Sequence, residues 1–207
     1  MRTDSQGYSD YLEGKYLPGR RLYLNWIFYP GIFSCFRTPD TIIDLGCGTG
    51  EFLNYCRRRN HDALGVDSNE TLAEKCRRNG FKVVSDNVCE LNSLNRQQFT
   101  YAVCDNVLEH LDIPELECFF ERVDRLLVGG GTLVCIVPGR KGFQKDPTHK
   151  TYICQELLEK LLKNRSLKIE RFYYHPFNVG GLHRYFYLNM QIFEIRKLPA
   201  DLTAQRA

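Results

Sequence analysis

After Pro39, short apolar runs alternate with amphipathic helical patterns along the chain. Each run is brief and almost unbroken, as expected for strands that helices cover on both faces. The alternation itself is typical of βαβ units and a parallel sheet. The runs predict strands over residues 41–45, 63–66, 82–84, 101–104 and 132–137.

Helices fit between these strands, over residues 51–59, 69–79, 114–127 and 155–162. The third has the clearest pattern, because its apolar residues recur at three- and four-residue spacing. Asp112 stands where its N-cap belongs, and Pro114 falls in the first turn. Gly80 follows the second helix as a C′ residue would.

Two further strands are predicted near the C-terminus, over residues 167–174 and 190–195, where apolar and polar residues alternate. Between them, an aromatic segment with glycines forms a loop or a short helix over residues 176–188. We expect the two strands to pair antiparallel and to close one edge of the sheet.

The composition is that of a globular protein. Hydrophobic residues make up 43% and charged residues 26% of the chain, which argues against a wholly disordered protein. A chain of 207 residues usually forms one domain, or one domain with a small extension. We therefore expect an aromatic-rich helical extension or lid over residues 1–38, a main domain over 39–200 and a disordered tail over 201–207.

The charges nearly balance, since 28 Lys and Arg against 25 Asp and Glu leave +3. This is too little to indicate a nucleic-acid partner, and no nucleic-acid module stands out. No apolar run reaches the roughly 18 residues of a membrane span, and residues 1–10 lack the pattern of a secretion signal. Nine scattered cysteines without a C-x-x-C pair suit a reducing compartment. These observations predict a cytoplasmic protein and leave its oligomeric state open.

The strongest chemical signal is the segment DLGCGTG at residues 44–50, which follows a predicted strand and opens a predicted helix. Glycines there permit a tight turn and let the backbone approach a ligand closely. The spacing is G-x-G-x-G, so the third glycine comes too early for the dinucleotide fingerprint. Asp44 would repel a pyrophosphate but not a sulfonium or an ammonium. The turn therefore favours a cationic ligand such as S-adenosylmethionine over NAD.

Polar residues also follow the next three strands. Asp67 ends the second strand, where an acidic residue accepts hydrogen bonds from ribose hydroxyls; alternatively, it only caps the next helix. Asp86 follows the third strand and could reach an adenine amino group. The segment DNVLEH, residues 105–110, comes directly after the fourth strand.

Together these stretches resemble the class I S-adenosylmethionine-dependent methyltransferases. The matching segments are DLGCGTG (44–50), LGVDSN (64–69), VSDN (84–87), YAVCDNVLEHL (101–111) and LLVGGGTLVCIVPG (126–139). The resemblance implies a Rossmann-like α/β fold: a seven-stranded, mostly parallel sheet with its last strand antiparallel and helices on both faces. One departure is Ala102, where many members have an Asp that is not a direct ligand.

The resemblance also implies that the chain binds S-adenosyl-L-methionine and releases S-adenosyl-L-homocysteine. On the matching residues, it assigns the cofactor contacts to Asp44, Gly46, Cys47, Gly48, Gly50, Asp67, Ser68, Asp86, Asn87 and Asn106.

Methyl transfer to a hydroxyl needs alignment of the acceptor and a base that takes its proton. Glu109 and His110 follow the fourth predicted strand, and His149 lies in the loop after the fifth. Because the carboxyl ends of parallel strands share one edge of the sheet, we expect these candidate catalytic residues to converge. Alternatively, His110 packs beneath the cofactor and His149 only caps a helix.

The segment NVLEH, residues 106–110, is similar to the E-x-x-E-H element of small-RNA terminal 2′-O-methyltransferases and ubiquinone-pathway O-methyltransferases. In those families, two glutamates and two histidines hold a divalent metal. Glu109, His110 and His149 match three of these ligands, but Asn106 replaces the first glutamate. Since Mg²⁺ favours carboxylate oxygens, this replacement weakens such a site. A divalent metal is therefore possible but not favoured, and no metal ligand is assigned.

The resemblance thus predicts an enzyme, and O-methylation of a small molecule or of a glycan or glycolipid precursor is the favoured reaction. Aromatic residues near both ends of the chain suit a sugar or a lipid headgroup, although the same rings would serve equally as ordinary core. Two alternatives stay open: a metal-assisted RNA ribose 2′-O-methyltransferase, and a protein that binds S-adenosylmethionine without catalysis.

Overall fold

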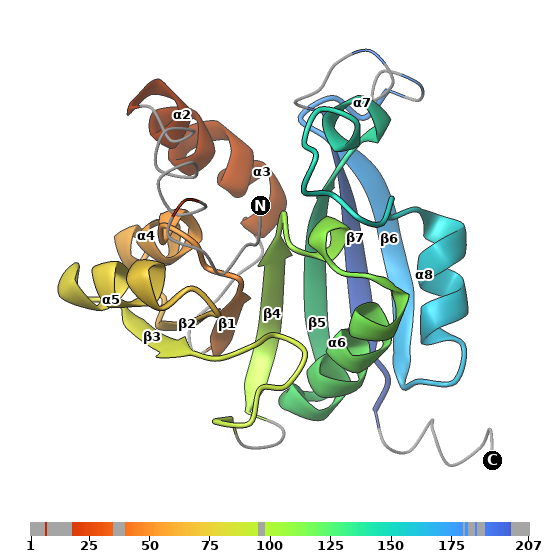
Figure 1. The fold of residues 1–207 in the computed structure, drawn as a ribbon, viewed down its shortest axis with the longest axis horizontal. Helices are drawn as coiled ribbons and strands as arrows, with labels where there is room; N and C mark the ends of the chain where they lie inside the picture. The colour runs from red at the N-terminus through yellow and green to blue at the C-terminus, as the bar shows by residue number, and fades with distance from the viewer. Residues whose placement is uncertain are drawn as a thin grey trace.

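The computed structural model describes residues 7, 18–34, 40–94, 98–179, 181, 185 and 189–199. Their strands form one seven-stranded sheet in the order β3-β2-β1-β4-β5-β7-β6 (Figure 1). The strands are Ile42–Leu45 (β1), Ala63–Asp67 (β2), Lys82–Ser85 (β3), Phe99–Asp105 (β4), Leu127–Pro138 (β5), Leu167–His175 (β6) and Met190–Lys197 (β7).

Strands β1 to β5 run parallel to one another, whereas β7 pairs antiparallel with both β5 and β6. This confirms the predicted mostly parallel sheet and the antiparallel pair near the C-terminus. The largest difference is at β5, which begins at Leu127 rather than at residue 132. Its pairing with β4 shifts in register there, and Gly130 has a φ of +79°. Residues 129–131, which precede the predicted strand, are therefore an irregular part of β5.

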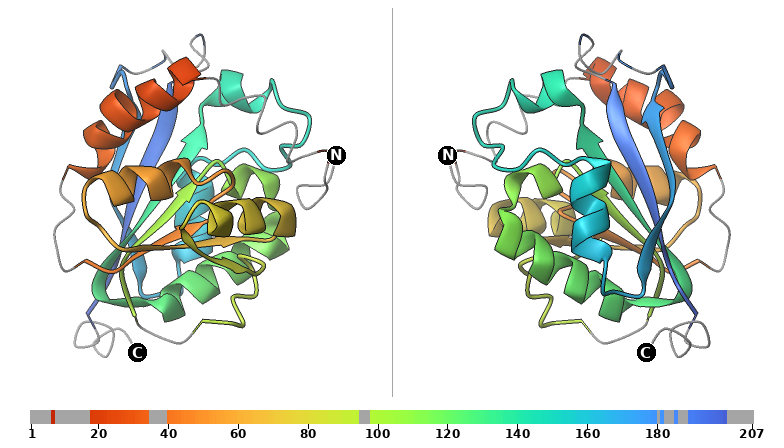
Figure 2. Two further views of the ribbon diagram at one scale, coloured as in Figure 1. Left: turned by 90° about the vertical axis from the view of Figure 1, so that its left-hand side faces the viewer. Right: turned by 90° about the vertical axis from the view of Figure 1, so that its right-hand side faces the viewer.

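The helices cover both faces of the sheet, as Figures 1 and 2 show. Residues of α3, α4 and η1 form a hydrophobic cluster with one face, and α5 packs beside α4, whereas α6 and α8 pack on the other face. The helices are α2 (Pro18–Tyr23), η1 (Leu24–Phe28), α3 (Tyr29–Phe33), α4 (Glu51–Arg58), α5 (Glu70–Arg78), η2 (Leu108–His110), α6 (Ile113–Leu126), α7 (Arg140–Phe143) and α8 (Gln155–Leu162).

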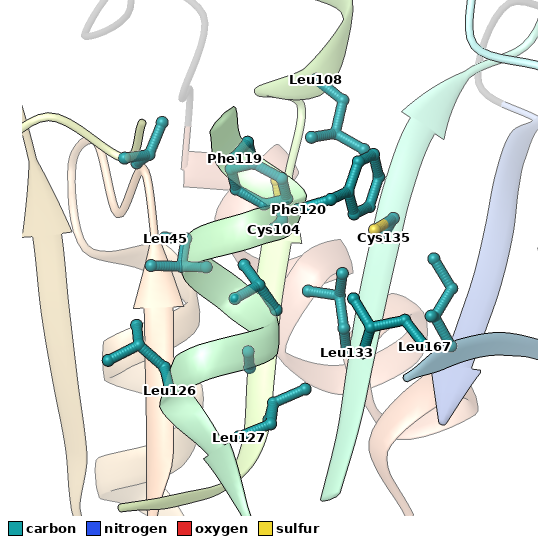
Figure 3. Close-up of a cluster of buried hydrophobic side chains, with 14 of the residues drawn as sticks. Leu45, Cys104, Leu108, Phe119, Phe120, Leu126, Leu127, Leu133, Cys135 and Leu167 are labelled. Atoms are coloured by element: carbon teal, nitrogen blue, oxygen red, sulfur yellow. The ribbon is translucent and has the colours of Figure 1, made fainter. Parts of the chain in front are cut away.

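The main hydrophobic core lies between the sheet and α6 (Figure 3). Phe119 and Phe120 of α6 are fully buried in the same cluster as Cys104 of β4 and Cys135 of β5. The helix begins where the sequence predicts. The side chain of Asp112 accepts from the backbone N–H of Glu115, whose carboxylate accepts from the backbone N–H of Asp112, which is a complete capping box. This helix supports the strands that carry the candidate site.

A second cluster lies under the N-terminal helices. Phe28, Tyr29 and Phe33 are buried and pack with Phe52 and Tyr55 of α4. These rings form ordinary core, as one of the two interpretations of the aromatic segment expects. Leu22, Trp26 and Ile27, in contrast, are exposed on the outer side.

The predicted extension, residues 1–38, is helical over Pro18–Phe33, and its boundaries and lid role stay predictions. Tyr8, Tyr11, Tyr16, Phe36 and the tail 201–207 lie outside the described residues, as does most of the segment 180–188. Within the described ranges, none of the helices combines the length and the apolarity that crossing a membrane requires.

Candidate active site

The turn between β1 and α4 carries three glycines with positive φ, namely Gly46 at +82°, Gly48 at +51° and Gly50 at +81°. Residues with a side chain rarely adopt this backbone conformation. At Gly46 a Cβ would also lie 2.3 Å from Cγ2 of Val107. The Gly46 N–H donates to the carbonyl of Val66 on β2 at 2.7 Å. The turn is thus held at the carboxyl edge of the sheet, where open α/β sheets bind ligands.

Asp44, at the end of β1, is buried, and its Oδ2 atom has no hydrogen-bond partner in the described part of the chain. Burial and the nearby charges of Asp105, Cys76 and Asp67 raise the pKa of Asp44 well above its usual range. A cation placed beside such a carboxylate would stabilise its ionised form. The residues here therefore fit a positively charged ligand, such as the sulfonium or α-ammonium group of S-adenosylmethionine.

Asp67 ends β2 beside the same turn. Its two carboxylate oxygens accept from the backbone N–H of Gly48 at 2.7 Å and of Asn69 at 2.8 Å. The side chain of Asn69, not that of Asp67, caps α5 by accepting from Leu72 N–H at 3.3 Å. The helix-cap interpretation of Asp67 is therefore wrong, and its carboxylate holds the glycine turn against β2. Ser68, the next residue, is exposed.

Asp86 and Asn87 follow β3, and their side chains organise the loop in which they lie. The Asp86 carboxylate accepts from the Ser93 hydroxyl at 2.6 Å and from the Ser93 N–H at 3.0 Å. These hydrogen bonds outweigh burial and hold the pKa of Asp86 below its usual value. The Asn87 side chain accepts from the Cys89 N–H at 2.9 Å. Both residues lie at the predicted edge, and their adenine contacts stay predictions.

Glu109, His110 and His149 come together, as the sequence predicts. One potential ligand atom from each side chain lies within 4.8 Å of the others. The Nε2 atom of His149 is 3.9 Å from Oε1 of Glu109 and 4.0 Å from Oδ2 of Asp146. The two imidazole rings meet edge to face, with centroids 4.9 Å apart. Glu109 is fully buried, so a carboxyl group lies directly beside the two imidazole rings.

Backbone carbonyls orient both imidazoles. Nδ1 of His149 lies 2.8 Å from the carbonyl of Phe143, and Nδ1 of His110 lies 3.3 Å from that of Thr148. Because a carbonyl only accepts, a neutral His149 carries its proton on Nδ1 and keeps Nε2 as an acceptor, whereas Nδ1 of His110 also lies 3.2 Å from the Thr148 hydroxyl. Phe143 is the last residue of α7, so the same contact also makes His149 a cap of that helix, as the alternative interpretation expects.

One contact at this edge has no counterpart in the sequence-based predictions. The Tyr29 hydroxyl of α3 donates to Oδ2 of Asp105, at the end of β4, at 3.0 Å. Oδ1 of the same carboxylate accepts from the Asn106 side chain at 2.6 Å. Asn106 has a φ of +56°, a strained conformation that is frequent at functional sites. No local signal predicts the contact, because Tyr29 and Asp105 are 76 residues apart.

The sheet order and the antiparallel β7 are those of the class I methyltransferase fold, and the glycine turn lies between Asp44 and Asp67 at its carboxyl edge. Residues 43–135 match the family model described as a methyltransferase domain. No curated protein matches the chain. Residues 43–135 are thus similar to a methyltransferase domain, the chain shares its fold with S-adenosylmethionine-dependent methyltransferases, and these similarities support an enzyme of that kind.

Solved structures share the fold at low identity. A SAM-dependent methyltransferase from Archaeoglobus fulgidus is 24% identical with a TM-score of 0.72, covering 92% of this chain and 100% of that one. The 1,6-didemethyltoxoflavin-N1-methyltransferase of Burkholderia thailandensis, with bound S-adenosylhomocysteine, is 18% identical with a TM-score of 0.62, covering 92% and 87%. Magnesium protoporphyrin IX methyltransferase from Synechocystis, with bound SAH, is 12% identical with a TM-score of 0.69, covering 94% and 95%.

Proposed function

We propose that this enzyme transfers the methyl group of S-adenosylmethionine to a hydroxyl oxygen of a small molecule or of a glycan or glycolipid precursor. The observation that carries the proposal is the convergence of His110, His149 and Glu109 at the carboxyl edge of the sheet. A hydroxyl is a poor nucleophile until its proton is removed, and imidazole titrates near neutral pH. The neighbouring methyltransferase structures carry names with different acceptors, so the fold alone does not select one.

The cofactor supplies an electrophilic methyl group on a sulfonium, and the chain binds and orients it. The glycine turn at residues 46–50 lets the backbone approach the cofactor, and Asp44 provides a negative charge beside its cationic part. Asp67 is the proposed acceptor for the ribose hydroxyls and Asp86 for the adenine amino group. The remaining proposed contacts are those of Cys47, Ser68, Asn87 and Asn106.

His149 is the better-placed base. Its Nδ1 proton is bonded to the Phe143 carbonyl, so Nε2 accepts the proton of the hydroxyl. The imidazolium that forms lies 3.9 Å from the Glu109 carboxylate and 4.0 Å from that of Asp146. Both negative charges stabilise it. Phe143 stacks on the His149 ring with centroids 5.3 Å apart, which limits the orientations that the ring can adopt.

Aromatic side chains near this base support a sugar-containing acceptor. Phe143 packs edge to face with Tyr152, and the Arg140 guanidinium lies 5.1 Å from the Tyr152 ring centre. The segment that follows β6 begins at the same edge of the sheet, and its Phe177 and Tyr185 are exposed. Rings and a guanidinium suit the faces and the hydroxyl groups of a sugar or of a charged headgroup.

A divalent metal at Glu109, His110 and His149 is a second candidate. Two imidazoles and one carboxylate are a donor set that transition metals accept, and a carbonyl-bonded Nδ1 is the usual support of a ligating histidine. Bound there, a metal would lower the pKa of an acceptor hydroxyl. The side chain of Asn106 is bonded to Asp105, so it adds no carboxylate to this donor set.

The test is incubation of the purified enzyme with methyl-labelled S-adenosylmethionine and fractionated cell extract. The proposal expects label in a small-molecule or glycolipid fraction, in a bond that survives mild base as an ether does. Label in base-labile esters, in amines or in RNA would contradict it. The His149→Ala variant, run in parallel, separates transfer by this site from background.

A further inference from the structure

The N-terminal helix places a phenol at the edge of the sheet. Tyr29 of α3 is 2% exposed, and its ring packs against Phe52 at 5.5 Å and Tyr55 at 5.4 Å between centroids. These contacts fix the ring, so the hydroxyl that bonds to Asp105 at 3.0 Å is held in place. A segment outside the family match thereby touches a residue within it.

Asp105 lies beside Asp44. Strands β1 and β4 are parallel neighbours, with Asp44 opposite Val103. Since side chains alternate along a strand, Val103 and Asp105 point to one face, and Val103 shares a cluster with Ile42, which lies two residues before Asp44 on β1. Asp44 and Asp105 therefore share a face, and the charge of Asp105 is one of the causes that raise the pKa of Asp44.

Three carboxyl groups, those of Asp44, Asp67 and Asp105, lie close together at this place. Burial raises the pKa of Asp105 to about 6, against the opposing effects of Tyr29, Asn106 and the Arg20 guanidinium of α2. Asp67 on β2 adds a third carboxylate that acts on Asp44. Asp44 is 2% exposed and its Oδ2 atom has no hydrogen-bond partner in the described residues. Neighbouring buried carboxylates without a cation repel each other and resist ionisation.

We propose that Asp105, positioned by Tyr29, is a second anionic ligand beside Asp44 for the positively charged methionine part of the cofactor. The inference rests on the methyltransferase assignment and adds a residue that the glycine turn does not include. It makes α3 part of the cofactor site, because Tyr29 orients the carboxylate. The cation is the α-ammonium or the sulfonium group, and the two can be told apart by ligand choice.

The test compares three ligands by calorimetry on wild type and on Asp105→Asn. S-adenosylmethionine carries both cations, S-adenosylhomocysteine carries only the α-ammonium, and 5′-methylthioadenosine carries neither. A lost hydrogen bond to a charged group weakens binding by about 10- to 100-fold. We expect that loss for S-adenosylhomocysteine and S-adenosylmethionine alike if Asp105 faces the ammonium, and for S-adenosylmethionine alone if it faces the sulfonium. Affinity for 5′-methylthioadenosine should stay constant.

Tyr29→Phe provides the second variant, because it keeps the ring and removes only the hydroxyl. It should weaken binding of the charged ligands in the same pattern. The expected loss of affinity is about 3- to 10-fold, which is the contribution of one neutral hydrogen bond. The matched control is Tyr55→Phe, which removes a hydroxyl from the same aromatic cluster and should leave the pattern unchanged. If Asp105→Asn does not fold, the Tyr29 and Tyr55 variants still decide the question.

Two results would overturn the inference. One is unchanged affinity for both charged ligands in Asp105→Asn or in Tyr29→Phe. The other is an equal loss for all three ligands, which would make the Tyr29–Asp105 contact purely structural. Failure of the methyltransferase assignment looks different, because wild type itself would then bind none of the three.

Discussion

The Nε2 atom of His149 faces the fully buried carboxylate of Glu109 at 3.9 Å, although the two residues lie on different loops. Glu109 belongs to the short helix after β4, and His149 to the segment after α7. The backbone N–H of Lys150 donates to the Glu109 carbonyl at 2.7 Å, which ties the two loops together. The imidazole of His149 and the carboxyl group of Glu109 are thus held close together by a backbone contact between their segments.

The first prediction concerns the base. His149→Ala should lower turnover by about 10²–10⁴-fold, the usual contribution of a positioned base, while affinity for S-adenosylhomocysteine stays nearly constant. Steady-state kinetics and calorimetry measure the two quantities. His61→Ala is the control, because His61 precedes β2, at the opposite edge of the sheet. Normal turnover with reduced stability would instead make His149 a helix cap only.

Much of the fold can be predicted from the local pattern of apolar and polar residues. The strand and helix positions follow from apolar spacing, and the start of α6 follows from Asp112, whose cap the structure confirms. The start of β5 cannot be predicted in this way. The residues 129–131 are glycines, which carry no strand signal, and only pairing with β4 across a register shift keeps them in the sheet.

The candidate site, too, can be predicted from the sequence only in part. The edge that holds Asp44, Asp67 and His149 can be predicted, because each residue lies near the end of a strand or in a loop that follows one. Asp67, Ser68 and Asn69 are all polar residues that could cap α5, and spacing alone does not predict that Asn69 does so. The bond from Tyr29 to Asp105 depends on how the N-terminal helix packs on α4, which no short-range pattern encodes.

The second prediction concerns the glycine turn. Gly46 and Gly80 have nearly the same φ, +82° and +79°, but a Cβ would collide with Val107 only at Gly46. Gly80→Ala should therefore cost about 1–2 kcal/mol of unfolding free energy, from backbone strain alone. Gly46→Ala should cost about 1–3 kcal/mol more because of overpacking. Urea unfolding of both variants checks this, and equal losses would exclude a role for the Val107 contact.

The third prediction concerns pH. The pKa of Asp105 is raised from 3.8 to about 6 in the folded chain, so the folded state binds more protons than the unfolded state between these values. The stability that this group contributes is therefore present below about pH 4 and lost as pH rises through 6. The free energy of unfolding of wild type minus that of Asp105→Asn should fall over this window and level off above about pH 7.

Asp44 changes this difference in the same direction, because its pKa is raised partly by the charge of Asp105 and the variant lacks that charge. Urea unfolding at several pH values, without cofactor, measures the difference. A flat profile between pH 4 and 7 would contradict a buried, weakly acidic Asp105. Asp86→Asn is the control, since the pKa of Asp86 is lowered rather than raised and its profile should stay flat between pH 4 and 7.

The last prediction concerns the metal. We expect methyl transfer to survive EDTA, because the Asn106 side chain is bonded to Asp105 at 2.6 Å and the Glu109–His110–His149 cluster offers one carboxylate for a cation that prefers several. Activity is measured after dialysis against EDTA, with and without added Mg²⁺ or Mn²⁺. Loss of activity that either ion restores would establish the metal mechanism and make His149 a ligand. Direct titration of Mn²⁺ into wild type and His149→Ala supports the distinction, since a ligand role predicts that the variant binds more weakly, whereas a base role predicts weak binding to both proteins.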